Sequence, residues 1–397
     1  MTQSKYFQMN ESAVVKMKWS VSEQLIPYSW FKQMRDEQPI YFDEQTQMWN
    51  VFRYHDIKSI LGNHHIFSSH QEKEEYTPFE ESILFIDPPR HKQLRSLVAK
   101  AFTPRAIEAL TPRIIQITNE WLDRVLEQGT MNVVADFASP LPVTIIAEML
   151  GIQSQDRDKF REWSLALVTF DPAQMLKPQQ EMTPYFTEIA NERRKRPQND
   201  LISALVQVKE EGIQLSDAEL IGFCILLLVA GNETTTNLIT ATLLCIANEP
   251  AAYQQVMSNH ERIPSLIEET LRYASPVQST QRFITEDVTF QGHPFKAGQT
   301  VLTWLASGNQ DEAVFEQPHL FDMNRSPNPH LTFGHGIHFC LGVMLARLEA
   351  KITFSSLLSR TRNIKIADHA VLERINSQSI FGLTELPITF EAQNCPN

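Results

Sequence analysis

Cysteine is scarce in this chain and is nowhere paired at short spacing. Four of the 397 residues are cysteines, Cys224, Cys245, Cys340 and Cys395, and no two of them form a CxxC motif. This spacing argues against a disulfide framework and for a reducing compartment. The first residues are polar and no apolar signal core follows them, so we expect a cytoplasmic protein.

Basic residues and long apolar runs are also limited. Lysine and arginine total 35 against 47 acidic residues, a formal net charge of −12, which argues against nucleic acid as a partner. Only residues 221–247 resemble a membrane span, and the polar segment 231–237 interrupts their centre. A lipid-exposed helix does not carry such a segment without cost, so we expect a buried helix and no membrane anchor.

Internal repeats are absent, and 42% of the residues are hydrophobic, enough to bury a large core. Apolar residues recur mostly at helical spacing, so we expect a mainly α protein with small β-sheets. Helices are expected at 56–61, from 87–90 onward, at 104–126, 141–150 and 163–168, then, after a break at 170–172 and a polar connection through Pro178, to near Arg196, and at 216–248, 266–272 and from 343 onward. Strands are expected at 48–53, at 132–134 and, as a hairpin region with turns at 293–294 and 297–298, at 288–290 and 300–302.

The helix expected from residue 216 is long and has a polar centre. Ser216 and Glu219 form a capping-box pattern, and at 1.5 Å per residue the helix spans roughly 50 Å. Glu233 and the threonines 234–236 are costly in a core unless they are paired or lie beside a cavity. The alternative is that the threonine hydroxyls bond back to the preceding turn and Glu233 reaches the surface.

A glycine-punctuated loop at residues 333–342 ends in Cys340 and Gly342 and leads directly into a helix. Unpaired backbone N–H groups and the positive end of the helix dipole favour a thiolate at that position. A thiolate offered in this way can bind a metal or attack carbon. The alternative is a buried, inert cysteine beside a turn.

The loop matches the haem-binding signature F-x-x-G-x-H-x-C-x-G of the cytochrome P-450 family at every specified position. Residues 230–234 resemble the oxygen-binding segment of that family's long central helix. Glu269 and Arg272 resemble its paired Glu and Arg, and Arg325 matches the third member of that polar network. The similarity covers nearly the whole chain in order and is closest to soluble bacterial members.

The resemblance implies one triangular, mostly helical catalytic domain over residues 1–397 with no fused reductase domain. It also implies haem b, with Cys340 as the axial ligand of the iron, and Glu233 and Thr234 as a proton relay to bound oxygen. Gly231 is expected to open the central helix beside that oxygen. The remaining implied residues are the haem contacts Ala230, Gly231 and Phe333, the propionate donors His91, Arg95, Arg282 and His338, and the structural network Glu269, Arg272 and Arg325.

The implied activity is that of a monooxygenase, which inserts one atom of O2 into an apolar small molecule such as a fatty acid, terpenoid or steroid, by hydroxylation or epoxidation. Electrons are expected from NAD(P)H through separate reductase proteins and a donor of the ferredoxin or flavodoxin type, and the enzyme is expected to be a monomer. Apolar residues near the implied site are candidates for the substrate pocket. They are Ile83, Leu84, Phe85, Val229, Val277, Ile380 and Phe381.

Three other readings of the same residues remain open. Cys340 can act as a nucleophile with His335 or His338 as its base, which makes a hydrolase or transferase. The same three side chains can hold a structural zinc, although the sequence suggests no fourth ligand. A haem enzyme can also use peroxide directly, as a peroxygenase; the presence of Glu233 and Thr234 argues for the oxygen-reducing route.

Overall fold

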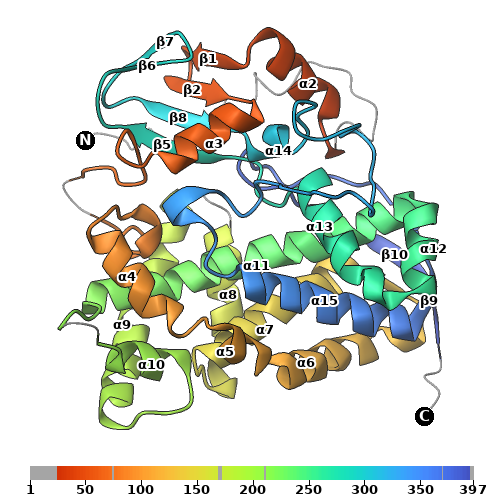
Figure 1. Ribbon diagram of the computed structural model, residues 1–397. Helices are drawn as coiled ribbons and strands as arrows, with labels where there is room; N and C mark the ends of the chain where they lie inside the picture. The colour runs from red at the N-terminus through yellow and green to blue at the C-terminus, as the bar shows by residue number, and fades with distance from the viewer. Residues whose placement is uncertain (1–24, 74–75, 169–171, 210–211, 369, 394–397) are drawn as a thin grey trace.

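The computed structural model describes residues 25–73, 76–168, 172–209, 212–368 and 370–393. A β-rich part, which includes helices α2, α3 and α14, lies on one side of a larger helical part (Figure 1). The helices are α2 (Tyr28–Glu37), α3 (Tyr54–Gly62), α4 (Arg90–Ala99), α5 (Pro104–Glu108), α6 (Thr111–Asp123), α7 (Pro140–Met149), α8 (Arg157–Val168), α9 (Pro172–Lys195), α10 (Leu201–Gln207), α11 (Asp217–Asn248), α12 (Pro250–Ser258), α13 (Ile263–Tyr273), α14 (Leu305–Gly308) and α15 (Val343–Arg360). The strands are β1 (Ile40–Asp43), β2 (Met48–Val51), β3 (Phe67–Ser68), β4 (Thr130–Asn132), β5 (Thr280–Ile284), β6 (Val288–Phe290), β7 (His293–Phe295), β8 (Thr300–Thr303), β9 (Thr361–Ile366) and β10 (Pro387–Ala392).

The largest sheet has five strands in the order β1-β2-β8-β5-β3, and two smaller sheets have the orders β4-β10-β9 and β6-β7. In the large sheet β2 and β8 run parallel, with Trp49 opposite Val301. Along β5 the side chains of Arg282 and Ile284 are buried while Phe283 between them is less so. Because side chains alternate between the two faces of a strand, this register places the Arg282 cation on a buried face.

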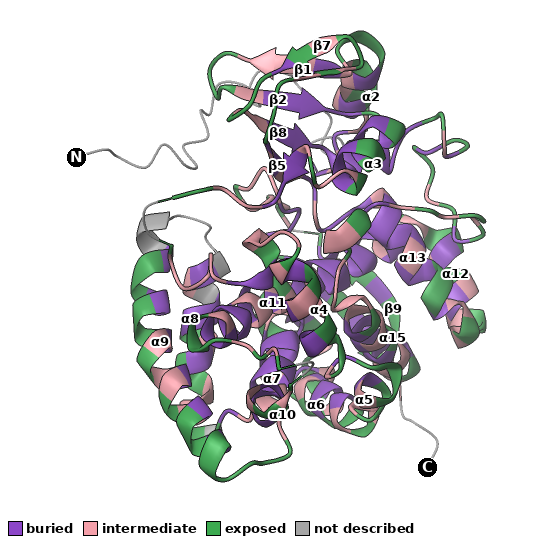
Figure 2. Ribbon diagram, turned by 60° about the vertical axis from the view of Figure 1, so that its left-hand side comes forward, coloured by how far each residue is buried: buried purple, intermediate pink, exposed green. Residues whose placement is uncertain are grey.

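Helix α11 crosses the helical part and is buried over most of its length (Figure 2). Its capping box is present: the Glu219 N–H donates to Ser216 Oγ at 3.1 Å, and the Ser216 N–H donates to the Glu219 carboxylate at 2.7 Å. Arg90 of α4 donates to the same carboxylate through Nε at 2.6 Å, which ties α4 to the start of α11. Helix α11 is long and apolar enough to cross a membrane, but the buried core helix of a globular protein has the same length and composition. In α11, 61% of the most apolar 18-residue segment is buried inside the protein.

Two strand predictions are wrong in part. Only Asn132 of the predicted strand 132–134 lies in β4, and the next residues form a π-helical turn, Val133–Ala138. Segments 288–290 and 300–302 are strands but do not pair with each other: β6 pairs with β7, which contains the predicted turn at 293–294. Gln291 and Gly292, with φ of 49° and 83°, make the tight turn between them. Two consecutive positive φ angles match the twist of a two-residue hairpin.

The polar connection predicted through Pro178 is also wrong, because α9 already begins at Pro172 and contains Pro178 and Pro184. Each proline inside a helix removes one backbone hydrogen bond. Here the helix is retained because it packs against α8, α10 and α11. The predicted break at 170–171 lies outside the described residues. The helix predicted at 104–126 is divided into α5 and α6, with Pro112 in the first turn of α6.

Candidate haem site

The Cys340 loop, residues 333–342, lies between the β-rich part and the helices α11 and α15 (Figure 1). Gly334 and Gly336 have φ of 75° and 74°, a region that side chains with a Cβ rarely adopt. A Cβ on Gly336 would lie 2.4 Å from the carbonyl oxygen of Leu61, so the loop approaches the end of α3 as closely as a backbone can. The Cys340 N–H closes the loop by donating to Phe333 O at 2.9 Å.

Cys340 is partly exposed, whereas Cys224 and Cys245 are buried, and Cys395 lies outside the described residues. The sequence predicted a thiolate at Cys340, but the surrounding protein groups alone favour the protonated thiol. Burial raises the pKa of the Cys340 thiol, and the Gly342 N–H and the Arg95 guanidinium lower it by less. A bound cation is therefore needed to hold the sulfur deprotonated, as metal ligation by cysteine requires.

The structure brings together the four predicted propionate donors. The rings of His91 and His338 lie 4.3 Å apart between centroids. Arg95 donates from Nη2 to the carbonyl oxygen of Phe339 at 2.6 Å, and the positive charge of Arg282, on β5, acts on His338, whose pKa is lowered by burial and by that charge. Burial, together with the neighbouring His338 and Arg95, lowers the pKa of His91 to about 4. His91 is therefore neutral at physiological pH and can donate one proton.

These residues fit the dianionic edge of a haem. Arg282 is 8% exposed and donates only to Gln281 O at 2.7 Å and to Thr280 Oγ1 at 3.4 Å; among the described residues no carboxylate lies within ion-pair distance of it. Burial lowers its pKa to about 10. The buried Nε2 atom of His91 makes no hydrogen bond, and that of His338 has only the Asp87 carboxylate, at 3.5 Å, as a neighbour. Buried cations and donors without partners are costly, so the site is built for an anion.

Asp87 belongs to this cluster, although the sequence indicated only a helix start there. Its Oδ1 lies 3.5 Å from His338 Nε2, and its Oδ2 accepts a short hydrogen bond from Ser68 Oγ. Burial alone would raise the pKa of Asp87, but the contacts with His338 and Ser68 outweigh it and hold the pKa at about 2. The ionised carboxylate therefore orients the His338 ring. No spacing rule links positions 87 and 338.

On the other side of the site, Ala230 is exposed although it lies at the middle of α11. The Thr234 hydroxyl donates to Ala230 O at 2.6 Å. It therefore bonds back to the preceding turn of the helix, as the alternative interpretation of the sequence predicted. Gly231 does not interrupt the helix, which continues through it. A Cβ there would lie 2.6 Å from Ile146 Cδ1, so the glycine lets α7 approach α11 closely.

Glu233 is half-buried and does not reach out to the surface, contrary to the second part of that alternative. Its Oε1 accepts a hydrogen bond of 2.9 Å from Asn237 Nδ2, one turn further along α11. Burial raises the pKa of the Glu233 carboxyl, and the hydrogen bond from Asn237 opposes part of the rise. The protonated form is therefore favoured relative to an exposed glutamate, as a proton donor requires.

A buried ionic network is formed by Glu269, Arg272 and Arg325. Arg272 is fully buried and donates two hydrogen bonds to Glu269, of 2.9 and 2.7 Å. It also donates to the carbonyl oxygens of Asn309, Pro318 and Leu320. The Arg325 Nε donates to Glu269 at 3.3 Å. The network joins α13 to the segment that leads into the Cys340 loop.

The candidate pocket residues are placed in three groups. The turn Ile83–Phe85 contacts α11, with Ile83 buried and Leu84 exposed. Val277 and Ile380 face each other in an antiparallel bridge. Val229 and Phe381 are 4% and 2% exposed and belong to the main hydrophobic cluster, where core packing alone accounts for them.

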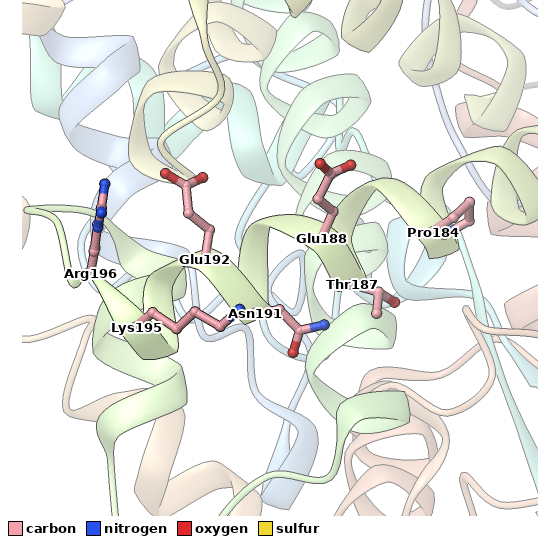
Figure 3. A pocket seen from close by; sticks show the side chains of 7 residues that line it. All are labelled: Pro184, Thr187, Glu188, Asn191, Glu192, Lys195 and Arg196. Carbon is pink, nitrogen blue, oxygen red and sulfur yellow. The ribbon is translucent and has the colours of Figure 1, made fainter.

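Two other features are not candidate sites. A surface hollow of about 650 Å³ lies along α9, and all its lining residues come from that helix and the residue after it (Figure 3). Among the described residues no three His, Cys, Asp or Glu side chains converge to hold a metal ion, so the zinc reading of His335, His338 and Cys340 has no ligand set. Haem iron needs only one protein ligand on this side.

Replacing Arg282 with glutamine should separate haem binding from folding. We expect haem affinity to fall roughly ten- to a hundredfold, since a charge-assisted hydrogen bond is lost. The apoprotein should unfold at the same or a higher denaturant concentration, because an unpaired buried cation is removed. The rate of haem transfer to apomyoglobin measures the first effect. Arg362→Gln, on an exposed ion pair, is the control, and an apoprotein weakened by R282Q would contradict the assignment.

The comparisons with known proteins agree with this geometry. The family model described as "Cytochrome P450" matches residues 14–170 and 170–392. Cytochrome P450 109 of Bacillus spizizenii is 42% identical over 381 residues, which are 93% of this chain and 93% of that protein. Substrate-free CYP109E1 from Bacillus megaterium superimposes with a TM-score of 0.89 at 41% identity, covering 94% of this chain and 100% of that one.

A second structure of CYP109E1, in complex with testosterone, has a TM-score of 0.85 at 43% identity over 91% of this chain and 99% of that one. These similarities confirm the predicted fold, mainly helical with small sheets around a long central helix. They leave the Cys340 nucleophile reading without support.

Proposed function

Because the chain belongs to the cytochrome P450 family of haem-thiolate monooxygenases, we propose that it hydroxylates or epoxidises an apolar small molecule, with electrons from NAD(P)H delivered by separate reductase proteins through a ferredoxin or flavodoxin type donor. We further propose haem b as the cofactor, the cytoplasm as the compartment, and a monomer with one catalytic domain. The observation that carries the proposal is the cluster of His91, Arg95, His338 and a buried, unpaired Arg282 around the loop that bears a partly exposed Cys340.

In this assignment Cys340 would ligate the iron, and His91, Arg95, Arg282 and His338 would bind the propionates. When bound, the haem supplies the redox chemistry by which O2, two electrons and two protons yield one inserted oxygen atom and one water molecule. The thiolate ligand favours cleavage of the O–O bond.

The protein supplies the protons. Burial raises the pKa of the Glu233 carboxyl, which suits it to donate a proton, and Thr234 Oγ1, on the same turn of α11, passes that proton on once it leaves the Ala230 carbonyl. The peroxygenase alternative needs no proton delivery from solvent, so the buried acid beside an alcohol favours the oxygen-reducing route.

The proposed substrate class rests on the candidate pocket residues and on one relative. Leu84, Val277 and Ile380 are apolar, and a relative of 43% identity binds testosterone. We therefore propose a steroid-like or similarly sized apolar molecule, such as a terpenoid or a fatty acid. Steroids, terpenoids and fatty acids should be screened for a low-to-high-spin shift of the haem spectrum and then for product with a reductase system. Turnover sustained by peroxide and never by reductases would reverse the preference.

Thr234→Ala should keep the haem but lower the product formed per electron several-fold, with the missing electrons recovered as hydrogen peroxide. The hydroxyl is the group next to Ala230 that can hold a proton, so its loss interrupts delivery. Oxygen uptake, peroxide and product are measured together. Thr236→Ala is the matched control, because that hydroxyl donates to Ala138 O in the core. Unchanged product per electron in T234A would contradict the relay.

A further inference from the structure

The Asn237 side chain, which donates a hydrogen bond to Glu233, is itself held by packing against a distant glycine. Asn237 is 2% exposed, and Gly382 of the segment before β10 packs directly on its amide. A Cβ on Gly382 would lie 2.3 Å from Asn237 Oδ1 and 2.8 Å from its Cγ. Real side chains essentially never approach this closely, so the amide keeps its present position only because residue 382 has no side chain.

We propose that Asn237 is the positioning residue that fixes the orientation of the Glu233 carboxyl, and that Gly382 sets the position of Asn237. The inference deepens the proposed function and rests on the role of Glu233 in proton delivery. Asn237 touches neither substrate nor cofactor in this assignment and acts through Glu233 alone.

The surroundings of Glu233 leave Asn237 as its main polar partner. Among the described residues the hydrogen bond from Asn237 is the only one to the Glu233 side chain, and no charged group acts on that carboxyl from the elements packed against α11, which are α7, α8, α9, α12, α13, α15, β9 and the turns Ile83–Phe85 and Val133–Ala138. The other polar side chains of this segment are engaged elsewhere: Asn232 donates to Ser164, and Thr236 to Ala138 O. Without Asn237 the carboxyl loses its fixed direction.

The role of Gly382 can be tested with a variant that should still fold. The nearest atoms that a Cβ would meet, Oδ1, Cγ and Nδ2, all belong to the end of the Asn237 side chain, so Gly382→Ala can be accommodated by rotating that side chain about its Cα–Cβ bond. That rotation breaks the 2.9 Å bond to Glu233. G382A and N237A should therefore have the same effect, and adding G382A to N237A should have none.

The first measurement is the infrared titration of the Glu233 carboxyl in the ferric, ligand-free holoenzyme, with the band assigned by comparison with E233Q. In N237A and G382A the titration should shift to higher pH by the same amount, because a donor to the carboxylate is lost. The double variant should match N237A alone. An unchanged titration in G382A, or shifts that add in the double variant, would overturn the proposal.

The second measurement is product formed per electron as a function of pH. It should fall in both single variants, while haem content and the spin shift on substrate binding stay as in the wild type. This separates the inference from the proposed function. If E233Q itself leaves product per electron unchanged, the relay fails, and the infrared titration still decides whether Asn237 and Gly382 position the carboxyl.

Discussion

Cys340→Ser should abolish the red-shifted Soret band that a reduced, carbon-monoxide-bound haem shows only with a thiolate ligand. Serine keeps the size of the side chain and the hydrogen bonds of the loop, including that from the Cys340 N–H to Phe333 O, so the loop should still form. What is lost is the donation of electron density from sulfur to iron. Monooxygenase activity should fall to background, because cleavage of the O–O bond depends on that donation.

The matched controls are Cys224→Ala and Cys245→Ala. Both thiols are buried on α11, and burial raises their pKa far above the ordinary value, so neither can serve as a thiolate. Both variants should keep the wild-type spectrum. If the thiolate-type band survived in C340S and disappeared in either control, Cys340 would not be the iron ligand.

The parts of the fold that were predictable depend on contacts close in sequence. Helix α11 was expected at 216–248 because Ser216 and Glu219 cap it and Pro250 follows it, and each of these signals acts within one turn. The β6-β7 hairpin was missed because Gln291 takes a positive φ that its residue type disfavours. Helix α9 was shortened in the prediction because two prolines penalise a helix locally, while the packing that retains it comes from distant elements.

The same distinction holds for the site. Cys340 and Arg282 could be proposed from motifs and a resemblance, but the roles of Asp87 and Gly382 could not. Asp87 meets His338, and Gly382 meets Asn237, only once separate elements have packed together. Asn237 is different, because it lies four residues after Glu233 on a predicted helix. The rule that residues at i and i+4 face each other could have identified it.

Glu269→Gln should be the most destabilising single change in the network behind the Cys340 loop. Arg272 and Glu269 are 0% and 1% exposed, and the partly exposed Arg325 shares the same carboxylate, so the variant leaves one fully buried and one partly exposed cation facing a neutral amide. Removing one partner of a buried ion pair costs about 3–5 kcal/mol. We expect a correspondingly lower denaturant midpoint and poor haem incorporation, since the network holds the segment that leads into the loop.

Three further variants should rank below E269Q in their loss of stability. Arg325→Gln should cost less than E269Q, because the Arg325 side chain is partly exposed and Glu269 keeps both bonds from Arg272. Arg272→Lys should weaken the network although the charge is kept, because an ammonium cannot reproduce the fork to Glu269 or reach three carbonyl oxygens at once. Lys296→Ala, on an exposed ion pair, should leave the midpoint unchanged. If E269Q were as stable as K296A, the network would not be what supports the cysteine loop.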